Sequence, residues 1–329
     1  MGDPAGIGPE LCLRSLREPS VLTQCVPVIF GDAGVLKRVA QNGIPNLGCA
    51  VLSLADWEKQ KAITQPLVVD CAAIALDTIV PGQISAACGN AAYIYIEHSI
   101  RAALRKQIAG VVTAPIHKEA LHLAKVPYPG HTEIFIALTH SKRGCMMLRS
   151  EVMTVSMVTT HIGYAEVPER LSLERIRDVI ELTDEAMRVI LGRTPRLAVC
   201  GLNPHAGEHG LFGRKEEERF IEPAVKAARE SGIHVEGPLP PDAAFTTSQR
   251  KRFDAFVTMY HDQGHIPFKM LAFETGVNVT LGLPIVRTSV DHGTAFDIAW
   301  RGMADPQSLY AAIRVAVELS GHRQGAGGA

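Results

Sequence analysis

Residues 255–265 read AFVTMYHDQGH, an apolar run that ends in a group of polar side chains around His261. Two other segments have the same order: VSMVTTHIG (155–163) contains His161, and LAVCGLNPHAGEHG (197–210) contains His205. A short apolar run bounded by turn residues predicts a buried strand. Ligands bind at strand ends in open α/β folds. The three segments therefore predict such a fold, with histidines at the strand ends.

Strand-like and helix-like segments alternate along almost the whole chain, which indicates an α/β fold built on mostly parallel strands. The strand-like runs are residues 26–32, 109–115, 153–160, 196–203, 255–261 and 277–283. The helix-like segments are residues 86–107, 172–191 and 215–231. Ser172 is a candidate N-cap of the second helix, and Gly232 is a candidate C-cap of the third.

A glycine-rich loop, GDPAGIGPE (residues 2–10), is expected to run into a helix in which Pro9 suits the first turn. Such a loop could bind phosphate through helix amides, or it could serve only as a tight turn with close backbone packing. It lacks the pattern of a dinucleotide fingerprint or a P-loop. Such loops also usually follow a strand. We therefore expect either a longer native N-terminus or a sheet that lacks one edge.

Composition narrows the class of protein. A chain of 329 residues predicts two domains. The formal net charge of −1 and the absence of a long basic run argue against nucleic acid as a partner. Seven cysteines without a CxxC pair predict reduced thiols. No apolar stretch is long enough for a membrane helix, so we expect a cytoplasmic protein with no membrane partner.

The three strand-end histidines predict a site for one divalent metal ion, because neutral imidazole is the commonest side-chain metal ligand. Each histidine taken alone is more often a hydrogen-bonded structural residue than a metal ligand. Three nitrogens fit Zn²⁺, Co²⁺ or Ni²⁺ better than Ca²⁺. Carboxylate oxygens of a substrate could instead recruit Mg²⁺ or Mn²⁺. A catalytic site of this kind leaves positions open for the substrate.

Several other residues are candidates for anion and cofactor binding. His131 and Thr132 are expected to begin a helix, where free amides favour anions. Cationic and amide groups follow at Lys269, Asn278 and Arg287, although each could lie on the surface. Lys118 could act as an acid or base, or be exposed at a helix start. The small-residue turn at positions 292–295 would let a cofactor approach closely.

Seven segments together resemble the 4-hydroxythreonine-4-phosphate dehydrogenase family of vitamin B6 biosynthesis. They span nearly the whole chain in order: GDPAGIGPE (2–10), TAPIHKEAL (113–121), YPGHTE (128–133), GLNPHAGEHGLFG (201–213), MYHDQGHIPFK (259–269), GVNVTLGLP (276–284) and RTSVDHGTAFDIAWRG (287–302). The resemblance implies two α/β/α domains around a cleft, the isocitrate/isopropylmalate dehydrogenase-like fold. We expect residues 1–125 with 274–329 to form the cofactor-side domain, and residues 126–273 the metal-side and dimer-side domain.

The resemblance also implies the roles of individual residues in a homodimer whose active site lies at the subunit boundary. The metal ligands would be His161, His205 and His261, one of them from the partner subunit. The substrate contacts would be His131, Thr132, Lys269, Asn278 and Arg287. NAD or NADP would bind near His292, Gly293, Thr294 and Ala295. Lys118 and Asp262 are the candidate catalytic acid or base residues.

The implied reaction is oxidation of the C3 hydroxyl of 4-phosphohydroxy-L-threonine by NAD, assisted by a divalent metal (Zn, Co, Mg or Mn) acting as a Lewis acid. Decarboxylation would then give 3-amino-2-oxopropyl phosphate. The segments KEALHLA, LFG and HDQGHIPFKML also resemble the family branch that oxidises 4-phospho-D-threonate or 4-phospho-D-erythronate. A different class, a metal-dependent hydrolase, would use the same histidines to activate water.

Overall fold

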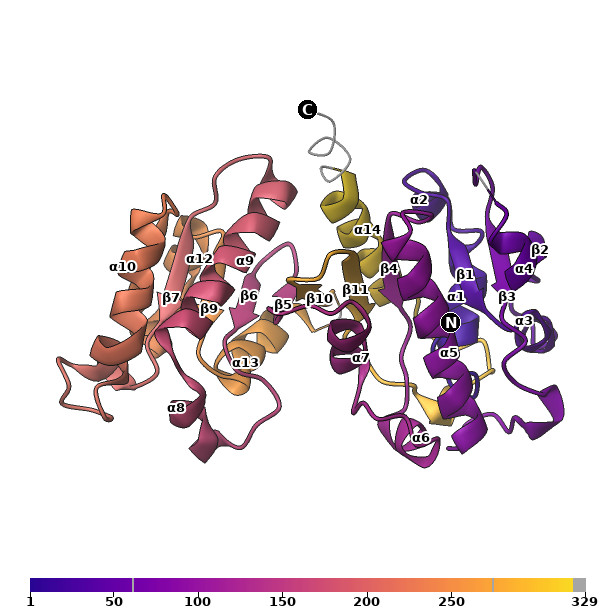
Figure 1. Ribbon diagram of the computed structural model, residues 1–329, viewed down its shortest axis with the longest axis horizontal. Helices are drawn as coiled ribbons and strands as arrows, with labels where there is room; N and C mark the ends of the chain where they lie inside the picture. The colour runs from indigo at the N-terminus through magenta and orange to yellow at the C-terminus, as the bar shows by residue number, and fades with distance from the viewer. Residues whose placement is uncertain (61, 274, 322–329) are drawn as a thin grey trace. The chain divides into compact units, whose positions relative to one another are not determined.

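The computed structural model describes residues 1–60, 62–273 and 275–321 (Figure 1). The chain forms two compact units, residues 1–141 with 283–321 and residues 142–282. Both ends of the described chain thus belong to the first unit, and the second unit is a single stretch between them. The sequence placed the two crossings at 125/126 and 273/274, whereas the structure has them at 141/142 and 282/283.

The first unit contains only parallel strand pairs. Strands β1, β3 and β2 form a sheet in that order, and β4 pairs with β11. The strands are β1 (Val28–Gly31), β2 (Ala50–Ser53), β3 (Leu67–Asp70), β4 (Gly110–Thr113) and β11 (Val286–Val290). The helices are α1 (Gly8–Ser15), α2 (Pro19–Leu22), α3 (Ala33–Ala40), α4 (Leu54–Trp57), α5 (Ala86–Leu104), α6 (Lys118–Leu123), α7 (His131–Leu138) and α14 (Gln307–Gly321), with short 3₁₀ turns η1 (Leu76–Thr78) and η5 (Phe296–Ile298).

Helices cover the buried strands of the first unit. Helix α5 packs on β1 and β4, and α14 packs on β4 and β11. Thr288 of β11 faces α14, where its hydroxyl donates to the carbonyl of Ala312 at 2.8 Å. The Ser85 hydroxyl accepts the backbone N–H of Cys88 and so caps α5. The helix predicted over residues 86–107 is confirmed, three residues shorter at its end.

The second unit is built on strands in the order β10-β5-β6-β9-β7-β8. The pairs of β5 with β10 and β6 are antiparallel, and the other pairs are parallel. The strands are β5 (Cys145–Arg149), β6 (Thr154–Met157), β7 (Leu197–Cys200), β8 (Val235–Leu239), β9 (Ala255–Thr258) and β10 (Val277–Leu281). The helices are α8 (Val167–Arg170), α9 (Leu173–Leu191), α10 (Glu222–Glu230), α11 (Pro241–Ala244), α12 (Thr247–Arg252) and α13 (His261–Ala272), with 3₁₀ turns η2 (Tyr164–Glu166) and η3 (Pro204–Gly207) and a π-helical turn η4 (Glu217–Ile221).

Alternating side chains of β6 face two different helices. Val155 and Met157 pack in an apolar cluster with Phe268 of α13. Ser156, between them, accepts a hydrogen bond from Thr183 of α9 at 2.8 Å. Successive side chains of a strand point to opposite faces of its sheet. Helices α9 and α13 therefore cover opposite faces of this sheet, which buries both sides as expected for a mostly parallel α/β unit.

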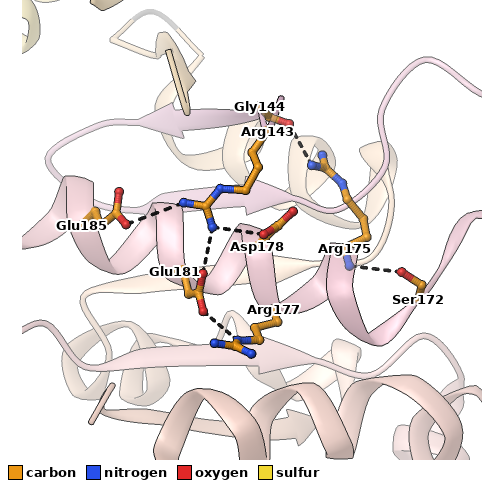
Figure 2. A network of polar contacts seen from close by, with 8 residues as sticks. All are labelled: Arg143, Gly144, Ser172, Arg175, Arg177, Asp178, Glu181 and Glu185. Atoms are coloured by element: carbon orange, nitrogen blue, oxygen red, sulfur yellow. Dashed lines mark hydrogen bonds and ion pairs between the residues drawn. The ribbon is translucent and has the colours of Figure 1, made fainter. Parts of the chain in front are cut away.

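Polar contacts fix the position of α9 (Figure 2). The Ser172 hydroxyl accepts the Arg175 backbone N–H at 3.1 Å, which confirms the predicted N-cap. The Arg175 guanidinium donates to the carbonyl oxygens of Val158 at 3.0 Å and Gly144 at 2.8 Å. These bonds tie the start of the helix to two loops of the sheet, including the loop that precedes His161.

The structure also tests two expectations drawn from composition, on membrane helices and on cysteines. Among the described residues, no helix is both long and apolar enough to cross a membrane. All seven cysteines are free, and five of them are buried. This agrees with the reduced thiols that the cysteine spacing predicts.

Candidate functional site

The glycine-rich loop packs closely against the strand ends of the first unit. Asp3 N donates to the carbonyl of Pro115 at 2.9 Å, and Ile7 N donates to that of Thr294 at 3.1 Å. A Cβ on Gly2 would lie 2.4 Å from the Pro115 oxygen, and Gly2 has φ +75°. Of the two readings of this loop, the geometry favours the tight turn with close backbone packing.

A cavity of about 110 Å³ lies in the first unit, and its lining includes predicted catalytic, substrate-binding and cofactor-binding residues. Lys118, His131 and His292 line it, together with Thr113 and Ser289. Thr113 is the last residue of β4, and Ser289 pairs with it near the end of β11. The cavity therefore lies at the carboxyl ends of two parallel strands, where an α/β fold is expected to bind a ligand.

His131 begins α7, as the sequence predicts, and the preceding Gly130 is the extended N-cap residue. The Nε2 atom of His131 is buried and has no hydrogen-bond partner among the described residues. Burial and the nearby charge of Arg287 lower the pKa of His131 well below its ordinary value. The imidazole is therefore neutral near pH 7, with one ring nitrogen unsatisfied beside the amides of a helix start. An anionic ligand oxygen would satisfy both groups.

Arg287 is a charged residue in the middle of the buried strand β11. Its side chain is 2% exposed, and Nη2 donates to the Thr113 hydroxyl at 2.9 Å. The guanidinium also lies 5.4 Å from the ring centroid of Phe135 in α7. Burial lowers its pKa to about 10, against some opposition from Glu133. A buried guanidinium binds anions strongly because little solvent screens its charge, so its position near His131 suits an anionic ligand.

Lys118 is the first residue of α6, and its side chain reaches toward Gly130. A Cβ on Gly130 would lie 3.8 Å from Lys118 Cε and 3.4 Å from Glu133 Oε2. Thr132 lies in the first turn of α7 and is half-buried. The lysine is exposed and lines the cavity together with His131.

The turn at residues 292–295 connects β11 to η5 and suits the close approach of a cofactor. A Cβ on Gly293 would meet no atom within 4 Å, so the space above this residue is open. Ala295 adopts φ +41°, and the Thr294 carbonyl is held by Ile7 N. His292 is exposed, and its Nδ1 lies 3.0 Å from the Gly293 oxygen. These small residues and the adjoining cavity fit a planar, polar group such as a nicotinamide.

Two of the three predicted metal ligands lie side by side in the second unit. His161 follows β6 and His261 begins α13 directly after β9, and these parallel strands are neighbours. The two ring centroids are 5.8 Å apart. Imidazoles that share one metal at about 2.0–2.1 Å from each nitrogen have centroids roughly 5–6 Å apart, so the pair fits a common ion.

Asp262 and His265 hold the His261 ring. Asp262 Oδ1 lies 2.7 Å from Nδ1 of His261, which leaves Nε2 for a metal. The buried His265 ring stacks on it with centroids 3.7 Å apart. Metal-binding histidines almost always donate their second nitrogen to a carboxylate, carbonyl or water. Asp262 therefore fits an orienting role for the predicted metal ligand.

His205 lies in a strained loop after β7. It has φ +53°, and Ala206 and Glu208 are also left-handed. The loop is anchored by Glu217, whose Oε1 accepts the N–H groups of Leu202 and Asn203 at 2.9 and 2.8 Å. The His205 ring is exposed and lies 6.1 Å from that of Phe212. Within the described part of one chain, no three His, Cys, Asp or Glu side chains come together as a metal site.

The remaining predicted substrate contacts, Lys269 and Asn278, also belong to the second unit. Lys269 lies on α13 with Nζ 5.7 Å from the ring centroid of Phe273. Asn278 lies on β10, and its buried Oδ1 has no partner among the described residues. Their roles as substrate contacts stay a prediction.

Three residues that support predicted site residues were not predicted from the sequence. They are Thr113, Glu217 and His265. Thr113 binds Arg287, Glu217 anchors the His205 loop, and His265 stacks on His261. The signal for His265 was available, since a residue four positions after His261 on one helix shares its face. Thr113 and Glu217 are distant in sequence from the side chains that they support, and only the fold brings them together.

The chain matches the family model described as "Pyridoxal phosphate biosynthetic protein PdxA" over residues 23–316. It belongs to the PdxA family. It is 45% identical over 317 residues to a 4-hydroxythreonine-4-phosphate dehydrogenase of Desulforapulum autotrophicum, covering 96% of this chain and 93% of the relative. It is 43% identical over 322 residues to a D-threonate 4-phosphate dehydrogenase of Salmonella typhimurium, covering 97% of each.

Among solved structures, it resembles a 4-hydroxythreonine-4-phosphate dehydrogenase from Klebsiella pneumoniae. The TM-score is 0.85 and the identity 41%, with 97% of this chain and 98% of that chain covered. This PdxA structure and its relatives confirm the predicted isocitrate/isopropylmalate dehydrogenase-like fold and the predicted class of enzyme, a dehydrogenase. Dehydrogenases of this family depend in general on NAD and on a metal. The alternative of a metal-dependent hydrolase is not retained, because the family is one of dehydrogenases.

Proposed function

We propose that this PdxA-family protein oxidises the C3 hydroxyl of a four-carbon acid phosphorylated at C4, with NAD as the hydride acceptor. The substrate that the sequence predicts is 4-phosphohydroxy-L-threonine, and decarboxylation of its 3-oxo product gives 3-amino-2-oxopropyl phosphate. The second candidate is 4-phospho-D-threonate or its erythronate isomer. The Salmonella relative, named a D-threonate 4-phosphate dehydrogenase, favours this candidate.

The observation that carries the proposal is the pairing of His131 with the buried Arg287. An unsatisfied buried imidazole nitrogen and a buried guanidinium lie at the start of α7. A phosphate monoester offers negative charge and acceptor oxygens of the kind that a guanidinium and an imidazole N–H bind. We assign the phosphate to His131, Arg287 and the hydroxyl and amide of Thr132. Thr113 is a positioning residue, because it holds Arg287 by its hydroxyl.

The cofactor fits the open turn at residues 292–295, beside the cavity that His292 lines. When bound there, the nicotinamide supplies the hydride acceptor, and the protein supplies orientation. Loss of the hydride from C3 must be accompanied by loss of the hydroxyl proton. Lys118 lines the same cavity as His131, and we assign it this proton transfer.

The metal fits His161 and His261, whose rings are spaced for one ion, and Asp262 holds the second nitrogen of His261. A divalent ion there supplies Lewis-acid polarisation of the substrate hydroxyl. We assign Asp262 the orientation of His261.

We propose further that the third ligand, His205, comes from the partner subunit of a homodimer. Two observations support this arrangement: His161 and His261 lie together in one chain, and no trio forms within its described residues. The backbone of the His205 loop is strained, which is common where a residue is held for function. The strain is sustained by the buried carboxylate of Glu217.

The proposed function is tested by reduced-nicotinamide absorbance. Purified protein with a divalent metal and NAD⁺ is given 4-phosphohydroxy-L-threonine, 4-phospho-D-threonate or 4-phospho-D-erythronate in parallel. We expect reduction of NAD⁺ with at least one of them, and a much lower rate with the matching acid that lacks phosphate. Absence of reduction with every phosphorylated acid would refute the proposal, and equal rates without phosphate would refute the role of His131 and Arg287.

A further inference from the structure

The side chain of Gln263 joins the ends of two neighbouring strands in the second unit. Its Oε1 accepts the N–H of Met259, the residue after β9, at 2.7 Å, and its Nε2 donates to the carbonyl of Gly201, the residue after β7, at 2.8 Å. The residue is only 8% exposed, so water competes little for these two bonds. The buried carboxamide thus forms a bridge between two backbones, called the Gln263 bridge below.

The Gln263 bridge lies where the pairing of the two strands ends. Strands β7 and β9 are parallel, with Val199 opposite Val257. The same register, continued by two residues, sets Gly201 opposite Met259. The carboxamide bonds to both of these residues, where the ladder would otherwise continue. The strands can therefore diverge beyond their last pair while the Met259 amide and the Gly201 carbonyl stay paired.

Met259 connects the bridge to the loop that carries His161. Its carbonyl accepts the Thr159 N–H at 3.1 Å and the Thr159 hydroxyl at 2.8 Å. Thr159 lies two residues before His161, and Met259 lies two residues before His261. The bridge is therefore linked through Met259 to the segments of two predicted metal ligands, and through Gly201 to the loop of the third.

Both ends of the bridge are attached to closely packed parts of the second unit. A Cβ on Gly264, the next residue of α13, would lie 2.9 Å from Thr258 Oγ1 and 3.0 Å from Val155 Cγ2, so the first turn of α13 packs directly on β9 and β6. The loop after Gly201 is held by Glu217, whose Oε1 accepts the N–H groups of the next two residues at 2.9 and 2.8 Å. A change in the bridge is therefore transmitted to the segments that it joins.

We propose that Gln263 is a positioning residue of the metal site, because its carboxamide sets the separation of the strand ends that carry His261 and His205 and, through Met259, of the loop that carries His161. This inference rests on the metal site proposed above. In the homodimer proposed there, His205 of one chain completes the site of the other, so each Gln263 supports ligands of both sites. The role requires an amide, which offers a donor and an acceptor together without a charge.

Amide hydrogen exchange in the full, metal-free chain tests the bridge itself. Gln263→Met keeps the length of the side chain and removes both hydrogen bonds. Gln249→Met is the matched control, because Gln249 is half-buried on α12 of the same unit and its Oε1 has no partner among the described residues. We expect Gln263→Met alone to raise the exchange rates of the Met259, Leu202 and Asn203 amides by about tenfold or more. Exchange in β1 and β3 of the first unit should not change.

Metal binding tests the positioning role. Competition with a chelator for Zn²⁺ and Co²⁺ should show that Gln263→Met lowers affinity by about 10- to 100-fold, the range found for groups that hold metal ligands in place. The visible absorption spectrum of bound Co²⁺ should change as well, since it depends on the arrangement of the ligands and not on overall stability. Gln249→Met should match the parent in both measurements.

Gln263→Glu separates the two halves of the bridge. Near pH 8 its carboxylate keeps an acceptor for the Met259 N–H but has no donor for the Gly201 carbonyl. We expect the Met259 amide to stay protected while the Leu202 and Asn203 amides exchange faster, with a weaker affinity for metal than in the parent. This variant decides the question if Gln263→Met does not fold.

The proposal is overturned if Gln263→Met and Gln249→Met give the same exchange rates. It is also overturned if exchange is faster but the affinity and the Co²⁺ spectrum equal those of the parent, because the bridge would then be purely structural. Absence of metal binding by the parental chain would instead refute the proposed metal site, and the role of Gln263 with it. None of these measurements depends on enzymatic activity.

Discussion

Replacement of Arg287 by methionine separates the stability of the protein from its affinity for phosphate. Burial lowers the pKa of Arg287 from 12.5 to about 10. Since each tenfold change in an equilibrium is about 1.4 kcal/mol, the charged form costs the folded protein about 3 kcal/mol without ligand. Methionine removes that cost and keeps the packing against Phe135, but loses the hydrogen bond to Thr113, worth about 1 kcal/mol.

We therefore expect Arg287→Met to raise the free energy of unfolding of the ligand-free protein by about 1–3 kcal/mol near pH 7. The sign follows from the lowered pKa. Below about pH 10 the guanidinium is charged in both states and its penalty is fully present, and the penalty disappears as pH rises toward 12.5. The gain in stability should accordingly shrink at alkaline pH.

Substrate binding should change in the opposite direction. Loss of one partner from a buried, hydrogen-bonded charge pair costs about 2–5 kcal/mol, which corresponds to a rise of roughly 30- to 5,000-fold in Kd or KM. Differential scanning calorimetry with and without inorganic phosphate measures the first effect. Initial rates of NAD⁺ reduction measure the second.

Arg143→Met is the matched control. Arg143 bonds Asp178 and Glu181 at 3.1 and 2.9 Å on α9 (Figure 2), and its side chain is 41% exposed. Its loss should cost at most about 1 kcal/mol and leave KM unchanged. A KM for Arg287→Met within threefold of the parent would refute the assignment of phosphate to Arg287. A large loss of stability in the ligand-free variant would refute the argument from burial.

Three further outcomes are expected. Asp262→Asn should weaken metal binding by about 10- to 100-fold, measured by competition with a chelator, while the circular dichroism spectrum stays unchanged; unchanged affinity would remove Asp262 from the site. Mixing His205→Ala with His261→Ala subunits should restore about a quarter of parental activity if each site is shared across a twofold interface, because only mixed dimers contain one intact site; no recovery would place all three ligands in one chain. Burial raises the pKa of Asp3 to about 6. The folded state then favours protonated Asp3, so its contribution to stability is lost as pH rises from about 4 through 6, and Asp3→Asn should flatten Tm over that range.

The sequence predicts six of the strands and misses β3 (Leu67–Asp70), although its first three residues are apolar and buried. All six strand-like runs contain a strand of the structure. Strand β2 was not predicted, since most of its residues are exposed and give no apolar pattern. Strand β5 is rich in methionine, which favours a helix as readily as a strand.

Strand β11 was missed for a functional reason. It reads VRTSV, and every residue of it is buried, including Arg287. A charged residue in a buried strand breaks the pattern by which buried strands are recognised. Such violations are expected at functional sites, where a local rule is broken for the sake of a ligand. The feature that concealed the strand is thus the feature on which the proposed phosphate site rests.

For the three histidines, the sequence predicts the position at a strand end but not the direction of the side chain. Strands β6, β9 and β7 are adjacent and parallel, so the sequence rightly places His161, His205 and His261 at one edge of one sheet. Position at an edge does not fix the direction of a side chain. His261 begins a helix beside His161, whereas His205 lies in a left-handed loop held by Glu217. That buried carboxylate accepts two loop amides, and a rearrangement of the loop that broke those bonds would be unfavourable. A second subunit that presents its own His205 leaves them intact, which is the physical reason to prefer the shared site.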